Sequence, residues 1–266
     1  AYGYLDEAIT LAGNGFNEPI PATWMSVAVD EDMLIELAYT HKARFRANVA
    51  RTLADRQAVD WDQVIADAED GITEDWVMDM DYYAGWWAES IYYGSIPGWA
   101  EANNFVIGMA DQDGNYQRWL DLLPTNDAKV PNPEGEDPII FVTPDTRFAQ
   151  GATVAEQEAN PGTLFAIPDG LPGDRAWGIA NVWKRPDRGS WRWSWYWHID
   201  TEDNWSFVDF SWPQVTIAEM DLLRAEGMYW NGQEADAAAI VNTYRTANGL
   251  AATDAAGTNT DCVPRL

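Results

Sequence analysis

The sequence predicts a mainly α fold, in which a helical scaffold is interrupted by one long irregular segment. Apolar residues recur at helical spacing over the first 72 residues and again after Pro213. Between these parts the helical spacing is lost, and eight of the 14 prolines fall from Pro124 to Pro172. Long loops of this kind in compact domains are commonly functional. We expect a single domain over residues 1–266 with little β structure. Its parts are a helical scaffold at 1–72, a loop excursion with aromatic clusters at 73–212, and a helical hairpin with a tail at 213–266.

The first predicted helix spans residues 4–12, where Leu5, Ala8, Ile9 and Ala12 form one apolar stripe. Gly13-Asn14-Gly15 ends it, and a connector rich in turn residues follows. The second predicted helix covers 31–51 after Asp30, a good N-cap. Its apolar stripe includes His41, which is therefore expected to be a core histidine with satisfied hydrogen bonds.

Basic side chains gather on the other face of this second helix, at Lys42, Arg44, Arg46 and Arg51. In so acidic a chain they are expected to form salt bridges within the fold, and exposed pairs of this kind are individually weak. A third helix is predicted over 60–70. Asp60 is its N-cap and Gln63 occupies the capping-box position.

Two further helices are predicted near the end of the chain. Pro213 is expected to open the first, over about 214–230, and Asn231-Gly232-Gln233 turns the chain into the second, over 234–247. Asn248-Gly249 is a typical stop. The pair makes a helical hairpin of about 34 residues, the length of a tetratricopeptide repeat.

Charge and composition narrow the function classes. Sixteen basic against 43 acidic residues leave a net charge of −27, which repels nucleic acid and anionic membranes and suits a neutral or cationic ligand. The single cysteine rules out a disulfide framework. Asp111, Asp113 and Asn115 resemble the start of a calcium loop, but Leu122 stands where the pattern requires glutamate. We therefore expect a turn there, and no metal or cofactor anywhere in the chain.

The 16 tryptophans exceed what a core of this size needs. Sugar rings present apolar C–H faces that stack on aromatic planes, while their hydroxyl groups need polar partners. Each aromatic residue could instead pack in the core, although the adjacent pair Trp86-Trp87 cannot point both rings the same way. The predicted ligand face consists of Tyr82, Tyr83, Trp86, Trp87, Tyr92, Trp99 and Asn103.

A second aromatic cluster alternates from Trp191 to Trp197 with the period of a β-strand. Alternation places the four indoles on one face, and Tyr196 and His198 with other polar residues on the opposite face. The indoles could line an extended glycan, or they could pack as the wall that holds the loop excursion.

Two patterns in the chain are typical of one known protein family. The first runs from Ala218 to Glu226, reading Ala-Glu-x-x-Leu-x-x-Ala-Glu, and continues through Gly232 and the helix of Ile240 to Arg245 to Asn248-Gly249-Leu250. The second, Asp145-Thr146-Arg147-Phe148, is similar to the family's Asp-x-Arg-Phe loop. The Leu37 to Arg44 helix and Asp60-Trp61 also look like elements of this family. With these elements the chain resembles the SusD/RagB family of outer-membrane nutrient-binding lipoproteins.

The resemblance implies a non-catalytic surface protein on a tetratricopeptide-like scaffold, with aromatic loops that capture a nutrient, often a glycan. It also implies delivery to a SusC-like TonB-dependent transporter at the outer face of the outer membrane. A lipid anchor would supply the only membrane contact, and the chain is expected to be the middle and later part of such a protein, without that anchor.

Two other function classes stay open on the residues alone. Glycoside hydrolases combine aromatic subsites with paired carboxylates, and Asp79 with Asp81 or Glu202 with Asp203 are candidate pairs. A structural subunit of a surface layer or filament would also suit the acidity and the helices. The sequence contains no nucleophile elbow, phosphate loop, zinc-protease or dinucleotide motif, so we expect no enzyme and assign no catalytic residues.

Overall fold

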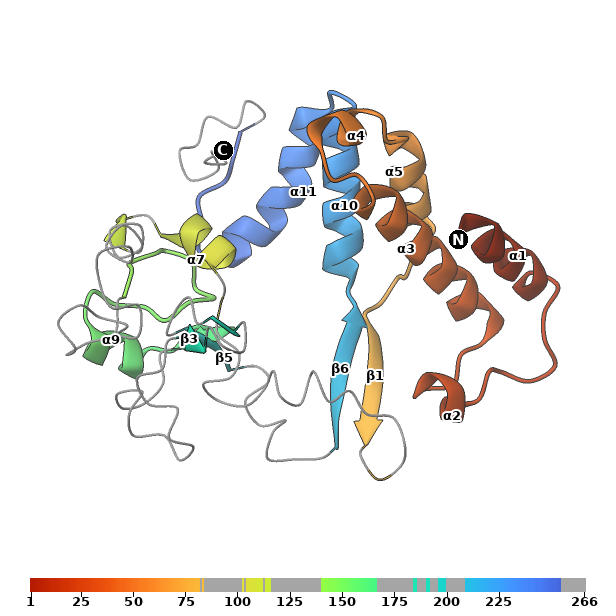
Figure 1. Ribbon diagram of the computed structural model, residues 1–266, viewed down its shortest axis with the longest axis horizontal. Coiled ribbons are helices and arrows are strands. Elements are labelled where there is room, and N and C mark those ends of the chain that lie inside the picture. The colour runs from red at the N-terminus through yellow and green to blue at the C-terminus, as the bar shows by residue number, and fades with distance from the viewer. Residues whose placement is uncertain are drawn as a thin grey trace. The chain divides into compact units, whose positions relative to one another are not determined.

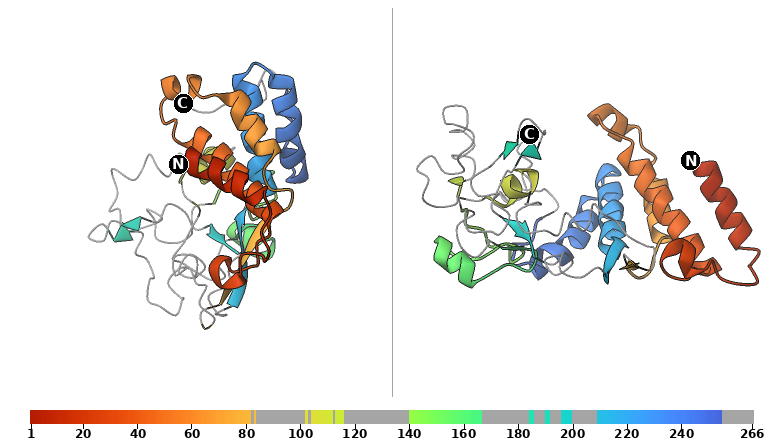
Figure 2. Two further views of the ribbon diagram at one scale, coloured as in Figure 1. Left: turned by 90° about the vertical axis from the view of Figure 1, so that its right-hand side faces the viewer. Right: turned by 60° about the horizontal axis from the view of Figure 1, so that its bottom comes forward.

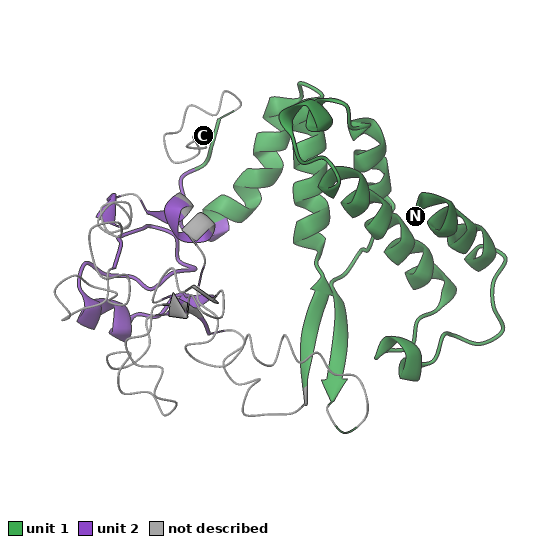
Figure 3. Cartoon of the chain, viewed as in Figure 1, with its two compact units in different colours: residues 1–87, 208–246, 252–263 green, residues 88–207, 247–251, 264–266 purple. Residues whose placement is uncertain are grey.

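A computed structural model confirms the mainly α fold (Figure 1). The structure describes residues 1–81, 83, 102, 104–111, 113–115, 140–166, 184–185, 190–191, 196–199 and 209–254. The chain divides into two compact units, which are described separately (Figure 3). Unit 1 comprises residues 1–87, 208–246 and 252–263, and unit 2 comprises 88–207, 247–251 and 264–266. No helix in the described ranges is both long and apolar enough to cross a membrane.

Helices α3 and α5 form the centre of unit 1. Helix α1 packs against α3, and α10 packs against α5 and α3. The core between them includes Leu37, Trp61, Val64, Met220 and Leu223. The helices of this unit are α1 (Tyr2–Ala12), α2 (Ala22–Met25), α3 (Glu31–Asn48), α4 (Leu53–Gln57), α5 (Trp61–Glu69), α10 (Ile217–Trp230) and α11 (Glu234–Ala247).

The starts of the second and third predicted helices are confirmed by their caps, whereas the first helix begins two residues earlier than predicted, at Tyr2. The Asp30 carboxylate accepts from the Met33 N–H at 2.9 Å, and the Asp60 carboxylate accepts from the Gln63 N–H at 3.1 Å. The predicted end of the second helix at residue 51 is wrong, because α3 ends at Asn48. A separate helix, α4, follows behind a capping box in which Thr52 and Asp55 bond each other's backbone N–H.

Three basic residues of this face, Lys42, Arg44 and Arg46, make the internal ion pairs that the charge predicts. Arg51 lies beyond the end of α3 and forms no ion pair among the described residues. Lys42 lies 2.9 Å from Asp6 of α1 and 3.5 Å from Asp67 of α5. Arg46 Nε donates to Asp67 at 2.7 Å. Arg44 forms a two-pronged pair with Glu219 of α10. The Asp67 side chain is fully buried, so this centre differs from the weak surface pairs expected.

Strands β1 (Trp76–Asp81) and β6 (Asp209–Val215) form an antiparallel ribbon that runs directly into α10 (Figures 1 and 2). The predicted helix start at Pro213 is therefore wrong. Pro213 lies opposite Val77 beside a register shift, where a residue without an N–H fits the ladder. The helix begins at Ile217, because the Thr216 side chain accepts from the Glu219 N–H as its N-cap.

The last two helices are joined at Gly232, whose φ of 76° suits the tight turn. Helix α10 makes its extensive helix contacts with α5 and α3. In α11, which is described throughout, Ala237 is the one buried residue, and Tyr244 donates to Asp221 of α10 at 2.6 Å. Tetratricopeptide-like packing stays a prediction.

Unit 2 contains a small aromatic core. Phe141, Phe148, Phe165 and Tyr196 pack together with Ile107. Its described elements are α7 (Asn104–Ala110), α9 (Val154–Ala159), and two short antiparallel pairs, β2 (Phe165–Ala166) with β5 (Trp197–His198) and β3 (Lys184–Arg185) with β4 (Ser190–Trp191). Helix α9 lies inside the proline-rich segment predicted to be irregular, and a Thr153–Glu156 capping box starts it.

Candidate ligand-binding site

Tyr83 is the one residue of the predicted ligand face that lies within the described ranges. It follows β1, in which Trp76, Met78 and Met80 alternate inward. The Tyr83 N–H donates to the Asp81 carboxylate at 2.7 Å, and the Tyr83 side chain is 81% exposed. The local turn therefore turns this aromatic residue toward solvent. The remaining members, Tyr82, Trp86, Trp87, Tyr92, Trp99 and Asn103, lie outside the described residues.

Two carboxylate groups lie on β1 shortly before Tyr83. Asp79 and Asp81 lie two residues apart on β1, so their side chains leave the same face of the strand. The exposed Asp79 carboxylate accepts from the Ser211 Oγ of β6 at 2.6 Å, which fixes its orientation. A ligand hydroxyl could donate to these carboxylates.

A second exposed aromatic residue, Trp24, was missed by the sequence reasoning, which treated residues around Pro21 as a connector. Residues 21–28 form a closed loop, because Ile20 and Val29 exchange backbone hydrogen bonds of 2.8 and 3.0 Å. Helix α2 lies in this loop beside the end of β1, and the Trp24 side chain is 71% exposed. The Ser26 hydroxyl donates to the Asp79 carbonyl oxygen and holds the loop against β1.

The Trp191 to Trp197 run contains two separate short strands in different sheets, with residues 192–195 outside the described ranges. The described side chains at the end of this run are Tyr196 and, directly after Trp197, His198. Tyr196 is buried among Phe141 and Phe148, and His198 packs on Phe165 with ring centroids 4.4 Å apart. The side of the run that carries Tyr196 thus contributes to the core of unit 2. The positions of the four indoles fall outside what the structure describes.

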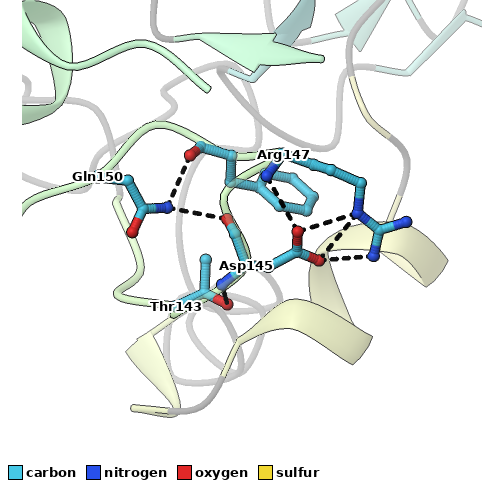
Figure 4. A network of polar contacts seen from close by, with 5 residues as sticks. Thr143, Asp145, Arg147 and Gln150 are labelled. Carbon is cyan, nitrogen blue, oxygen red and sulfur yellow. Dashed lines mark hydrogen bonds and ion pairs between the residues drawn. The ribbon is translucent and has the colours of Figure 1, made fainter. Parts of the chain in front are cut away.

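The Asp-x-Arg-Phe loop folds around one buried carboxylate (Figure 4). Asp145 accepts from the Arg147 N–H at 3.0 Å, from Arg147 Nε at 2.9 Å and from Arg147 Nη2 at 2.6 Å. These bonds raise the pKa of the Arg147 guanidinium. Gln150 donates to the carbonyl oxygens of Asp145 and Phe148 at 2.8 and 2.7 Å. The loop is therefore a hydrogen-bonded turn in which the Asp145 carboxylate balances the positive charge of Arg147.

This loop contacts the end of the first family-like pattern, at Asn248-Gly249. The Thr146 N–H donates to the Asn248 carbonyl oxygen at 3.0 Å. A Cβ on Gly249 would lie 2.7 Å from the Pro144 carbonyl oxygen. Glycine is also required at position 162, because a Cβ there would lie 2.2 Å from the Arg147 carbonyl oxygen of the loop. Both glycines permit a close approach of backbone to backbone.

The calcium-like segment is a turn in the part that the structure describes. The Asp113 carboxylate accepts from the Asn115 N–H at 3.0 Å and from the Asn115 side chain at 2.6 Å. Within the described residues no cluster of three potential metal-ligating side chains occurs.

His41 differs from the expected core histidine with satisfied hydrogen bonds. It is half-buried and stacks on Phe45 with ring centroids 5.6 Å apart. Its Nδ1 is buried without a hydrogen-bond partner among the described residues. Burial lowers the pKa of His41, the positive charge of Arg44 lowers it further, and Glu219 partly opposes both.

Comparisons of this chain with protein-family models, with curated proteins and with solved structures gave no match. The functional argument therefore depends on the residues and contacts described above.

Proposed function

We propose that this protein captures a nutrient, most readily a neutral oligosaccharide, without cleaving it. Its place is the outer surface of an outer membrane, and a SusC-like TonB-dependent transporter is its partner. We base it on the family resemblance, and we take the aromatic segment that begins at Tyr83 as the ligand face.

One observation carries this proposal: the two family-like patterns lie against each other. Thr146 of the Asp-x-Arg-Phe loop bonds the backbone of Asn248 in the Asn-Gly-Leu pattern, about a hundred residues further along the chain. Their contact supports the reading of both as parts of one inherited architecture.

The geometry at Tyr83 supports a ligand role for that end of the ribbon. The exposed Tyr83 side chain follows just after a strand face that carries the Asp79 and Asp81 carboxylates, the first of them oriented by Ser211. Aromatic planes with a few fixed polar groups are what sugar rings require. The negative charge of the chain adds a bias against anionic ligands.

The test is a titration of the full chain with a panel of neutral oligosaccharides, read by tryptophan fluorescence and by calorimetry, with a parallel assay for new reducing ends. Saturable binding without release of reducing ends is the expected result. Release of reducing ends would identify a glycoside hydrolase instead. Absence of binding together with self-assembly into ordered arrays would favour a structural subunit.

A matched pair of variants ties the binding to the ribbon end. Tyr83→Ala is expected to weaken the affinity, while Tyr4→Ala, at an equally exposed tyrosine on α1, is expected to leave it unchanged. Equal effects of the two substitutions would argue against a ligand face at Tyr83.

A further inference from the structure

We infer that Trp24 is a ligand-stacking residue, and that the loop of residues 21–28 exists to hold its indole beside the ligand face at the end of β1. The inference rests on the proposed function and adds to it a residue and a subsite. The ligand group assigned to this subsite is a neutral hexopyranose ring of an oligosaccharide.

The loop is fixed at its base and at its tip. Ile20 and Val29 close the base through two backbone hydrogen bonds. At the tip the Ser26 hydroxyl bonds the Asp79 carbonyl oxygen of β1. Trp24 lies two residues before this anchor, Asp81 ends β1 two residues after Asp79, and Tyr83 follows just beyond the strand. Trp24 and Tyr83 therefore belong to the same end of the ribbon.

The loop does not need Trp24 for its own packing. Met25 and Val27, on either side of Ser26, are the residues that pack against the core of unit 1, together with Ile20. Burying a tryptophan side chain removes about 150–250 Å² of surface from water. With 71% of the side chain exposed, Trp24 keeps most of that surface accessible to a ligand ring.

Backbone strain points the same way. Ser26 has a φ of 69°, and it is the one non-glycine residue with a positive φ in the described part of the chain. Such conformations persist where surrounding contacts enforce them, and they cluster at ligand sites. Here the hydroxyl bond to Asp79 holds Ser26 in place at the C-terminal end of α2, the helix that carries Trp24.

The charge of the neighbourhood selects among ligands. Asp79 is exposed and Asp81 is half-buried on the same face of β1. Their carboxylates accept hydrogen bonds from sugar hydroxyl groups, and they repel uronate and sulfate groups. A neutral ring that stacks on the indole therefore fits this subsite better than an acidic sugar.

The test compares full-length variants by calorimetry with the neutral oligosaccharide that binds the wild type best. Trp24→Ala is expected to lose about tenfold in affinity, and Trp24→Phe is expected to lose less because a ring remains. Ser26→Ala frees the loop tip and is expected to weaken binding while Trp24 is intact. Tyr229→Ala, at another exposed aromatic residue, is the control and is expected to bind as the wild type does. Circular dichroism of each variant verifies the fold.

The outcomes separate this inference from the function it rests on. Wild-type binding with an unchanged affinity in Trp24→Ala would overturn the assignment of Trp24 and leave the proposed function standing. Absence of glycan binding in the wild type would overturn both. Tighter binding of an acidic glycan or of a lysine-rich peptide, lost in Trp24→Ala, would overturn the neutral-sugar assignment.

Discussion

Thr146 and Asn248 are joined by a backbone hydrogen bond of 3.0 Å, so the loop at 143–150 is held directly against the turn that follows α11. The turn can approach because residue 249 is glycine. Gly249 has a φ of 75°, and the Pro144 carbonyl oxygen occupies the space that a side chain would need.

Gly249→Ala is therefore expected to destabilise the protein more than Gly232→Ala. Both glycines have a φ near 75°, so both substitutions add about 1–2 kcal/mol of left-handed backbone strain. Only Gly249 has a neighbour within 4 Å, because the space around Gly232 is open. Urea unfolding of the two variants measures the difference, and equal losses would mean that the loop and the turn do not touch in solution.

The buried carboxylate of Asp67 predicts a second large effect. Asp67→Asn removes the charge that Lys42 and Arg46 share, and breaking a buried ion pair costs about 3–5 kcal/mol. Lys42 keeps Asp6, so the lower end of that range is expected. Asp70→Asn makes the same chemical change at an exposed position just beyond α5 and should be nearly neutral. A loss in Asp67→Asn no larger than the control would show that the centre contributes little.

Local signals account for what the sequence predicted well. The starts of α3 and α5 follow from Asp30 and Asp60, because an N-cap acts on residues two or three positions away. The short helices α4 and α9 have too few residues to show a periodic stripe. Their capping boxes, Thr52 with Asp55 and Thr153 with Glu156, were the available signal.

Non-local contacts account for what the sequence could not predict. Pro213 has the position of a helix opener, but pairing with Val77 of a distant strand places it in β6. Trp24 belongs to a loop that Ser26 ties to Asp79, more than fifty residues away, and no local pattern encodes that bond.

Tyr196 forms the polar centre of unit 2, and this centre predicts a third effect. Its hydroxyl donates to Gln157 Oε1 at 2.7 Å and accepts from the Phe141 N–H at 3.2 Å, while Gln157 donates to the Phe141 carbonyl oxygen at 2.9 Å. Tyr196→Phe leaves two buried groups without partners and is expected to cost about 1–3 kcal/mol. Tyr229→Phe is the exposed control. Urea unfolding checks the difference, and stability equal to that of the control would contradict the network.

His41 predicts how stability changes with pH. Its pKa is lowered in the folded protein, mainly by burial and further by Arg44, so the neutral ring is the folded form. The unfolded chain binds the proton more tightly, with a pKa of about 6.5. The contribution of His41 is therefore fully present above that pH and is lost as the pH falls below it. His41→Gln removes this titration, so the wild type is expected to lose more stability than the variant between about pH 7.5 and pH 5.5. Urea unfolding at both pH values measures the two losses.

The pH range ends above the pH at which carboxylates titrate. The pKa of Glu156 is lowered by hydrogen bonds from the Ala152 N–H and from Thr153, so this residue adds its own loss of stability at more acidic pH. Equal losses in wild type and variant would mean that the imidazole is as easily protonated in the fold as in the unfolded chain, and would contradict the buried, unpartnered Nδ1.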